Sequence, residues 1–295
     1  MKQSTHHDLP AKIIQTPITL TIAGSDSGGG AGIQADIKAI SATGGYACSV
    51  ITALTAQNTL DVTGIFPVSP AFVEQQLDAV FSDLKIQSVK IGMLSDASII
   101  RVVAQKLRQY QPKFIVLDPV MVATSGDLLL EADAIATLKS ELLPLATLIT
   151  PNLPEAVALT RNSSHSENDS RICSKEKEEG EESKSALIEQ LKQLNTEAIL
   201  LKGGHWEQEA QSTDYLIQKS DTVTLSAGRL HTKNTHGTGC TLSAAIASYL
   251  AQGYTLTEAV SKGKSYLTQA LRHADQLQIG QGHGPVHHFY ARQQS

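Results

Sequence analysis

Short apolar segments alternate with amphipathic helical patterns along most of this 295-residue chain. Each segment is hydrophobic at consecutive positions, which indicates a strand buried on both faces, as in a parallel sheet covered by helices on both sides. The predicted strands are 18–23, 48–54, 88–93, 114–117, 147–150 and 198–201. The pattern predicts an α/β fold in three layers, helix–sheet–helix, around a mostly parallel central sheet.

One segment interrupts this alternation. Residues 161–185 consist almost wholly of Ser, Asn, Asp, Glu and Lys, and they offer too little apolar surface to join a core. We therefore expect a single domain over 17–290 that carries a polar surface insertion at 161–185. A disordered or extended segment is expected at 1–16 and a tail at 291–295.

The charge, apolar runs and cysteines of the chain indicate which kinds of partner to expect and which to exclude. The formal net charge is −5 and no Lys/Arg-rich stripe occurs, so a nucleic acid is not expected as a partner. No apolar run is long enough to span a bilayer, so a membrane is not expected either. Cys48, Cys173 and Cys240 lie far apart and predict reduced thiols. A small-molecule partner and a cytoplasmic location follow as expectations.

The segment from Thr235 to Cys240 is the strongest candidate for chemistry. Gly237 and Gly239 form a turn that runs into a helical stretch of small residues. The start of a helix presents unpaired N–H groups and a partial positive charge, which together form an anion site. A cysteine there has its thiolate favoured, so Cys240 could accept the proton of a substrate hydroxyl. The alternative is that Cys240 only packs beneath the helix.

A glycine-rich loop from Gly24 to Gly32 follows the first predicted strand. It does not end in Gly-Lys-Ser/Thr, so it is no P-loop. Residues 30–35 meet the dinucleotide fingerprint loosely, which leaves an NAD-dependent oxidoreductase as an alternative, although the loop is long for that fold. We expect the loop to approach a flat ligand closely and Asp36 to reach the same ligand. Asp36 as a plain solvated residue is the alternative.

Three further strand ends carry groups suited to phosphate chemistry. Asn152 and Glu155 open a helix, either as a cap or as ligands of a hydrated Mg²⁺ ion, and Asp118 could add charge to the same site. Lys202 could neutralise the oxygens of a phosphoryl group in transfer. Together with the glycine turn, these residues supply the parts that phosphoryl transfer needs without a P-loop.

The chain resembles the ribokinase-like superfamily, and within it the hydroxymethylpyrimidine/phosphomethylpyrimidine kinases of thiamine biosynthesis. The resemblance runs from about Ile18 to Phe289, outside the polar insertion. The matching motifs are Ala23-Gly24-Ser25-Asp26, Gly32-Ile33-Gln34-Ala35-Asp36, Ala56-Gln57-Asn58-Thr59, Lys90-Ile91-Gly92-Met93-Leu94, Asp118-Pro119-Val120-Met121, Asn152-Leu153-Pro154-Glu155, Lys202-Gly203-Gly204-His205, Asn234-Thr235-His236-Gly237-Thr238-Gly239-Cys240-Thr241 and Gly284-Pro285-Val286-His287-His288-Phe289.

This resemblance implies a ribokinase-like kinase that uses ATP and Mg²⁺ and acts as a homodimer. Its substrate would be 4-amino-5-hydroxymethyl-2-methylpyrimidine, phosphorylated first to the monophosphate and then to the diphosphate for thiamine diphosphate synthesis. The alternatives within reach of the motifs are a pyridoxal/pyridoxine-type kinase and a non-catalytic pyrimidine-binding sensor.

The resemblance also implies a role for each matching residue. The pyrimidine would contact Gln57, Gly24, Asp36, Met93 and Val120, with the Gln57 amide matched to a ring nitrogen beside an exocyclic amine. The nucleotide would lie on Asn152, Glu155, Lys202, Thr238 and Gly239. Catalysis would rest on Cys240, Gly239, Gly237 and Lys202, where sugar kinases of the superfamily carry Asp in place of Cys240. Mg²⁺ would be held by Glu155, Asn152 and Asp118, mostly through water.

Overall fold

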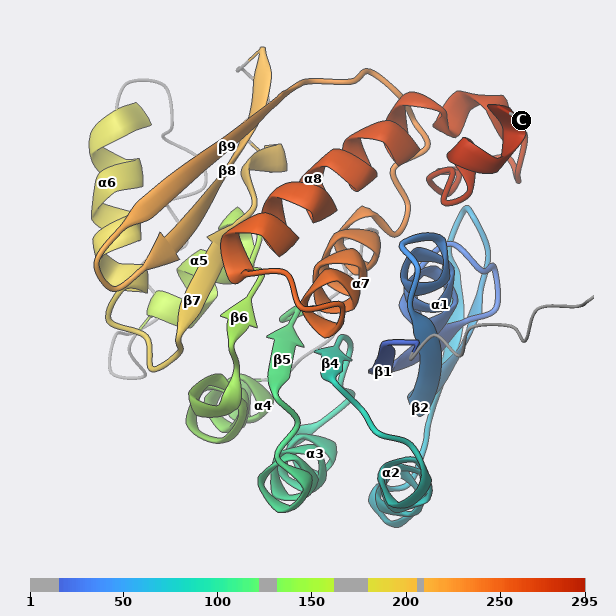
Figure 1. Cartoon of the computed structure of the whole chain (residues 1–295), viewed down its shortest axis with the longest axis vertical. Coiled ribbons are helices and arrows are strands. Elements are labelled where there is room, and N and C mark those ends of the chain that lie inside the picture. The colour runs from blue at the N-terminus through green and yellow to red at the C-terminus, as the bar shows by residue number, and fades with distance from the viewer. Residues whose placement is uncertain (1–15, 122–131, 162–179, 206–209, 295) are drawn as a thin grey trace, which may run out of the picture.

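The computed structural model describes residues 16–121, 132–161, 180–205 and 210–294. Over these residues the chain forms one sheet with helices on both faces, which confirms the α/β, three-layer prediction (Figure 1). The strands are β1 Ile18–Asp26, β2 Tyr46–Gln57, β3 Val62–Pro67, β4 Ser88–Ile91, β5 Phe114–Leu117, β6 Leu148–Ile149, β7 Ala198–Leu201, β8 Gln211–Gln218 and β9 Thr222–Gly228.

The sheet has the strand order β3-β2-β1-β4-β5-β6-β7-β8-β9. The six central strands are parallel to one another, and they are β2, β1, β4, β5, β6 and β7. These are the six strands that the apolar pattern predicts. The other three strands are antiparallel additions at the two edges. They were absent from the sequence prediction because they are partly polar. In β9, Val223 and Leu225 alternate with Thr and Ser, the pattern of a strand with one buried face.

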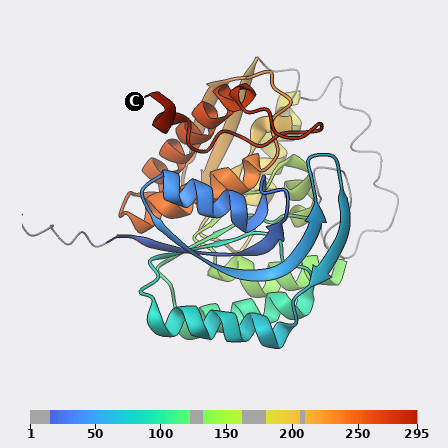
Figure 2. The ribbon, with the colours of Figure 1, turned by 90° about the vertical axis from the view of Figure 1, so that its right-hand side faces the viewer.

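Two helical layers cover the sheet (Figure 2). One face carries α1 Gly32–Ala42, α7 Thr238–Ala251 and α8 Leu256–Arg272, and α7 lies between the other two. The opposite face carries α2 Pro70–Asp83, α3 Ala97–Tyr110, α4 Ala132–Thr137, α5 Leu153–Thr160 and α6 Gly180–Leu191. No helix among the described residues is long and apolar enough to cross a membrane.

Side chains of the central strands alternate between the two layers, as the pleat requires. In β5, Val116 packs with α7 and α8, whereas Ile115 and Leu117 pack with the opposite layer. Leu20 and Ile22 of β1 also face the opposite layer. The strands are therefore apolar at consecutive positions because both faces are buried.

The order in which the chain adds strands to the sheet reverses at β1. The chain crosses from β1 to β2 through α1 on one face, and then returns to β4 on the other side of β1 through α2 on the opposite face. Ligands of such sheets bind beyond the carboxyl ends of the strands at the point of reversal. The register of the sheet aligns Ile22, Ile91, Leu117 and Ile149 across four strands. The polar residues that follow them therefore lie next to one another at the carboxyl edge of the sheet.

The predicted domain limits stay predictions, and some of the segments that they define fall outside the described residues. Residues 1–15 and 162–179 lie outside them, so the extended N-terminal segment and most of the polar insertion stay predictions. The end of that insertion belongs to a helix, because α6 begins at Gly180. The tail contains a short 3₁₀ helix, Tyr290–Gln294, which the sequence did not predict.

Candidate functional site

The glycine-rich loop after β1 is organised by one carboxylate. Asp26 accepts hydrogen bonds from the backbone N–H groups of Gly28, Gly30 and Ala31 at 2.8–2.9 Å, and from Nε2 of His236 at 2.9 Å. Although burial alone would raise it, these hydrogen bonds hold the pKa of Asp26 below its usual value. Asp26 therefore ties the loop before α1 to the segment before α7.

The two segments also approach each other too closely for side chains. Gly237, the N-cap of α7, has a left-handed backbone with φ of 77°, and a Cβ added there would lie 1.9 Å from the carbonyl oxygen of Gly30. A Cβ on Gly30 would in turn meet the His236 ring at 2.2 Å. The Gly237–Gly239 turn is therefore a glycine turn for steric reasons, and it presents the first N–H groups of α7 to the space above the sheet.

Three of the residues expected to contact the pyrimidine lie at the ends of neighbouring central strands. The Met93 side chain rests against Gly24, where an added Cβ would lie 2.6 Å from its methyl carbon. Val120 follows the end of β5, the next strand beyond β4, and is half-buried. The structure therefore brings Gly24, Met93 and Val120 to adjacent strand ends, with an apolar character suited to a flat ring.

Gln57 ends β2 and points toward the same region. Its Oε1 is 3.0 Å from Thr55 Oγ1, and its Nε2 is 3.3 Å from Nε2 of His236. Because Nε2 of His236 also contacts the ionised Asp26, that nitrogen carries a proton and cannot accept from an amide N–H group. The contacts are best satisfied with the Gln57 amide turned, so that Oε1 faces His236 and the NH₂ group donates to Thr55.

A cluster of charged groups lies beneath the start of α7. Lys202, next to the end of β7, places Nζ 2.9 Å from Oδ1 of Asp118 and 3.9 Å from Oε2 of Glu155. A Cβ added to Gly239 would lie 3.4 Å from Asp118 Oδ2 and 3.5 Å from Lys202 Nζ. The sequence predicted Asp118, Glu155, Lys202 and Gly239 as phosphate-site residues, and the structure brings all four together.

The charge states in this cluster follow from burial and pairing. Burial raises the pKa of Glu155 to about 7, with Lys202 pulling it down and Asp118 pushing it up. The pKa of Asp118 is lowered despite burial, because Lys202 and Lys90 stabilise its charge. The cluster therefore holds one fixed carboxylate, one fixed ammonium and one carboxyl that titrates near neutral pH.

Asn152 and Glu155 form a reciprocal helix cap. The Asn152 side chain accepts from the N–H of Glu155 at 2.9 Å, and Glu155 Oε2 accepts from the N–H of Asn152 at 2.8 Å. The capping interpretation of this motif is therefore confirmed. One oxygen of each nearby carboxylate keeps free capacity, since Glu155 Oε1 has only a 3.5 Å contact with the N–H of Met121 and Asp118 Oδ2 a 3.4 Å contact with Ser243.

This donor set fits a hydrated Mg²⁺ ion, which needs one or two carboxylates and keeps several waters. Glu155 and Asp118 would hold such an ion, and Asn152 would contribute through its cap of Glu155. The described residues contain no group of three or more His, Cys, Asp or Glu side chains arranged as a metal site. A cation here would therefore be completed by water and phosphate.

Cys240 is the third residue of α7, and the backbone N–H of Gly32 points to its sulfur. The sequence argument expected the helix start to favour its thiolate. Instead, burial raises the pKa of Cys240 to about 11, although Lys90 pulls it down. Desolvation outweighs the helix field, so the thiol is the stable form at neutral pH. The expected thiolate is therefore disfavoured in this structure, and a catalytic role for Cys240 stays a prediction.

Asp36 lies deeper than the sequence suggested. It is fully buried on α1 and paired with Lys90 of β4, with Nζ 2.8 Å from Oδ2. The alternative of a solvated helix residue is therefore wrong, and a contact with substrate stays a prediction. Sequence reasoning assigned no role to Lys90 or to the Asp26–His236 pair. A lysine within an apolar strand signals a buried charge, but nothing local names its partner.

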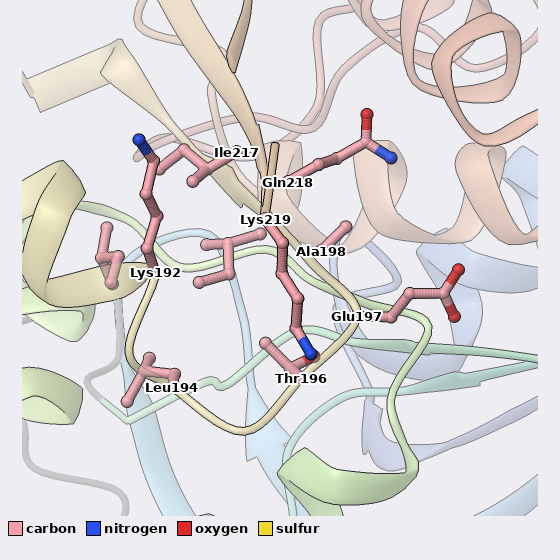
Figure 3. Close-up of a pocket in the computed structure, with 10 residues that line it drawn as sticks. Lys192, Leu194, Thr196, Glu197, Ala198, Ile217, Gln218 and Lys219 are labelled. Carbon is pink, nitrogen blue, oxygen red and sulfur yellow. The ribbon is translucent and has the colours of Figure 1, made fainter. Parts of the chain in front are cut away.

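Two cavities among the described residues differ in size and place. One holds only about 10 Å³ and sits at the amino end of β7, where Ala198 pairs with Gln218 (Figure 3). It has room for about one water. A larger groove of about 480 Å³ lies between β9 and α8. Its lining is rich in hydroxyl groups, with Thr224, Ser226, Thr257, Ser261, Ser265 and Thr268.

A family model described as phosphomethylpyrimidine kinase matches residues 26–287, nearly the whole described chain. The chain belongs to this family. A hydroxymethylpyrimidine/phosphomethylpyrimidine kinase from Rhizobium meliloti (strain 1021) is 52% identical over 275 residues, covering 93% of this chain and 98% of the relative. The chain is therefore a kinase with the ribokinase-like fold that the motifs implied.

Solved structures support the same assignment of fold. The crystal structure of phosphomethylpyrimidine kinase from Clostridium difficile 630 has a TM-score of 0.71 and 42% identity, covering 86% of this chain and 98% of that one. Pyridoxal kinase from Staphylococcus aureus, in complex with AMP-PCP and pyridoxal, has a TM-score of 0.78 and 28% identity, covering 94% of this chain and 95% of that one.

Proposed function

We propose that this kinase phosphorylates 4-amino-5-hydroxymethyl-2-methylpyrimidine with ATP, and then phosphorylates the monophosphate to the diphosphate for thiamine diphosphate synthesis. The observation that carries the proposal is the stacking of the α7 glycine turn over the Asp118–Lys202–Glu155 cluster. Fixed N–H groups and a fixed ammonium group stabilise the charge on a phosphoryl group in transfer. A family relationship at 52% identity supports the substrate class.

The pyrimidine would lie against Gly24, Met93 and Val120 at the strand ends, with its edge toward Gln57. Turned as the contacts with His236 and Thr55 favour, the Gln57 amide keeps one lone pair of Oε1 and one N–H for the ligand. That pairing suits a ring nitrogen beside an exocyclic amine. Asp26 would act indirectly, by holding His236 against Gln57.

In the transfer step, the substrate oxygen forms a bond to the γ-phosphorus as the bond to ADP breaks and ADP leaves with its electron pair. The hydroxyl proton must leave the oxygen, and in this proposal the thiolate of Cys240 receives it. Lys202 and the N–H groups of Thr238, Gly239 and Cys240 would neutralise the phosphoryl oxygens. Mg²⁺, when bound at Glu155 and Asp118, would offset the remaining phosphate charge.

The groove between β9 and α8 is our candidate for the nucleoside end of ATP. Its lining residue Lys264 donates to Asp214, and Asp214 accepts from the N–H of Gly203, next to Lys202. Its hydroxyl groups suit a ribose and an adenine edge better than an apolar partner. Assembly as a homodimer remains a prediction from the resemblance, and a location in the cytoplasm remains a prediction from the composition.

The deciding experiment is a mass-resolved assay with Mg-ATP that offers the hydroxymethylpyrimidine, its monophosphate and pyridoxal side by side. Formation of pyrimidine mono- and diphosphate supports the proposal. Phosphorylation of pyridoxal alone would overturn the substrate, and binding of the pyrimidine without consumption of ATP would favour a sensor.

Cys240→Ser tests the base separately. We expect turnover to fall strongly while ATP binding stays nearly unchanged, because the change removes the proton acceptor and little volume. ATP affinity is measured by calorimetry on the same preparation. Turnover near that of the parent would remove Cys240 from the base role and leave positioning, Lys202 and the metal as the sources of catalysis.

A further inference from the structure

The Asp36–Lys90 pair is a fully sealed ion pair under the site. Both side chains are 0% exposed, and Nζ lies 2.8 Å from Oδ2. The same oxygen accepts from Thr21 Oγ1 at 2.6 Å. The other carboxylate oxygen, Oδ1, is buried with no hydrogen-bond partner among the described residues. Such a pair adds little net stability, because the cost of desolvating two charges offsets their attraction.

The backbone around Lys90 is arranged to admit its ammonium group. Lys90 lies on β4, two residues before Gly92, and a Cβ added to Gly92 would lie 2.6 Å from Nζ. Nζ therefore occupies the space that a side chain would need at the end of β4, next to β1 at the point where the chain reverses direction. A fixed positive charge thus sits at the strand end where a ligand is expected.

The same pair lies close to Cys240. The N–H of Gly32 meets the sulfur of Cys240, and Asp36 is four residues further along α1, on the same face of that helix. β4 packs directly against α7, and Lys90 points to that side of the sheet because its neighbours Val89 and Ile91 face the opposite layer. The ion pair therefore lies between the sheet and the helices α1 and α7.

We propose that Lys90 is a positioning residue of this kinase, and that Asp36 holds its ammonium group where it stabilises negative charge on the sulfur of Cys240. The proposal rests on the proposed base role of Cys240, where Lys90 offsets part of the cost that burial imposes on a thiolate. It also accounts for a buried pair that stability alone does not require.

Charged groups from four elements face Cys240, and the test must separate them. Asp36 comes from α1 and Lys90 from β4, while Asp118 follows β5 and Lys202 follows β7. Asp36 and Asp118 oppose a thiolate, whereas Lys90 and Lys202 favour it. Only the first two are changed in the experiment below, so the contribution of the phosphate cluster stays constant.

The experiment compares Asp36→Asn with the double variant Asp36→Asn/Lys90→Met. In the single variant an amide oxygen can still accept from the ammonium group and hold it in place, but the opposing negative charge is gone. We expect the rate of alkylation of Cys240 by iodoacetamide at pH 8 to rise about tenfold, the effect of a pKa one unit lower. The double variant, with the same uncharged residue at 36 and no ammonium group, should lose that rise.

Peptide mass spectrometry assigns alkylation to each cysteine. Cys48 is the internal control, because burial also raises its pKa to about 11 while Lys90 is not among its partners. Its alkylation should be equal in all three proteins, and circular dichroism melting verifies that each is folded. Equal alkylation of Cys240 in the single and double variants would overturn the proposal.

A kinetic measurement completes the test. Turnover of the double variant should fall at least tenfold with the KM for ATP unchanged, since Lys90 acts on the acceptor and not on the nucleotide. Alkylation is measured without substrate, so its outcome does not depend on the proposed reaction. An altered thiol with unaltered turnover would keep the effect of Lys90 on Cys240 and overturn its role in catalysis.

Discussion

Two ion pairs in this kinase have the same N–O distance and opposite surroundings. Lys90 and Asp36 meet at 2.8 Å with both side chains sealed from water, and Arg108 and Glu141 meet at 2.8 Å with side chains 47% and 36% exposed. Water screens the second pair and leaves each partner well solvated when alone. In the first pair no water can replace a lost partner. Burial, and not the N–O distance, therefore decides how much stability is lost when one partner is removed.

The largest effect is expected from breaking the sealed pair. Lys90→Met should lower the free energy of unfolding by about 3–5 kcal/mol, because it leaves a carboxylate buried without a partner. The urea midpoint at pH 8 measures this. Asp36→Leu/Lys90→Met removes both charges and should recover most of the loss. A double variant as unstable as the single would show that packing, and not charge, is responsible.

The partly exposed pair of Lys202 and Asp118 should affect catalysis more than stability. Lys202 is 16% exposed and faces the proposed phosphate site. Lys202→Met should reduce kcat about 10²–10³-fold, the usual cost of removing one donor to a transition-state oxyanion. The melting temperature should change much less than in Lys90→Met. Unchanged kcat in steady-state assays would contradict the placement of the γ-phosphate over this cluster.

The third prediction concerns Glu155, whose pKa burial raises to about 7. A carboxyl with a raised pKa in the folded state is protonated below about pH 7, so its contribution to stability declines as pH rises from about 4.5 to 7. Metal binding requires the ionised form and moves the other way. The affinity for Mg²⁺ should therefore fall about tenfold per pH unit below 7.

Glu155→Gln is the matched control for that pH dependence. The variant keeps the cap geometry but cannot ionise, so Mg²⁺ binding measured by calorimetry from pH 5.5 to 8 should be weak and nearly flat. A slope in the variant equal to that of the parent would assign the titration to another group.

The smallest effect is expected at the exposed pair. Arg108→Ala should lower the free energy of unfolding by about 1 kcal/mol or less, as measured for surface pairs. Raising the salt concentration should shrink even that difference. A loss comparable to that of Lys90→Met would mean that the exposed pair is not screened, and the comparison between the two pairs would fail.

Local sequence patterns predicted the fold because burial on both faces leaves a clear mark. The six central strands are apolar at consecutive positions, whereas β3 is mostly exposed and gave no such signal. The strand ends likewise revealed Asp118, Glu155, Lys202 and the glycine turn, since parallel strands deliver their carboxyl ends to one edge. The topology, and not any distance along the chain, brings these residues together.

What the sequence could not supply were partners and protonation states. Asp26 and His236 are separated by 210 positions, so neither predicts the other. Helix position alone predicted a thiolate at Cys240, but the depth of burial, which only the packed structure gives, favours the thiol. Lys90 could be recognised as an anomaly in an apolar strand, while its counter-charge on α1 could not.

The contact between Asp26 and His236 also bears on how this enzyme is made. One partner is synthesised near the start of the chain and the other near its end, and the glycine turn over the phosphate cluster comes only after β9. A fragment that ends with β9 would contain the sequence of every strand of the sheet but would lack His236 and the glycine turn. Such a fragment should not transfer phosphate, whatever part of the sheet it forms.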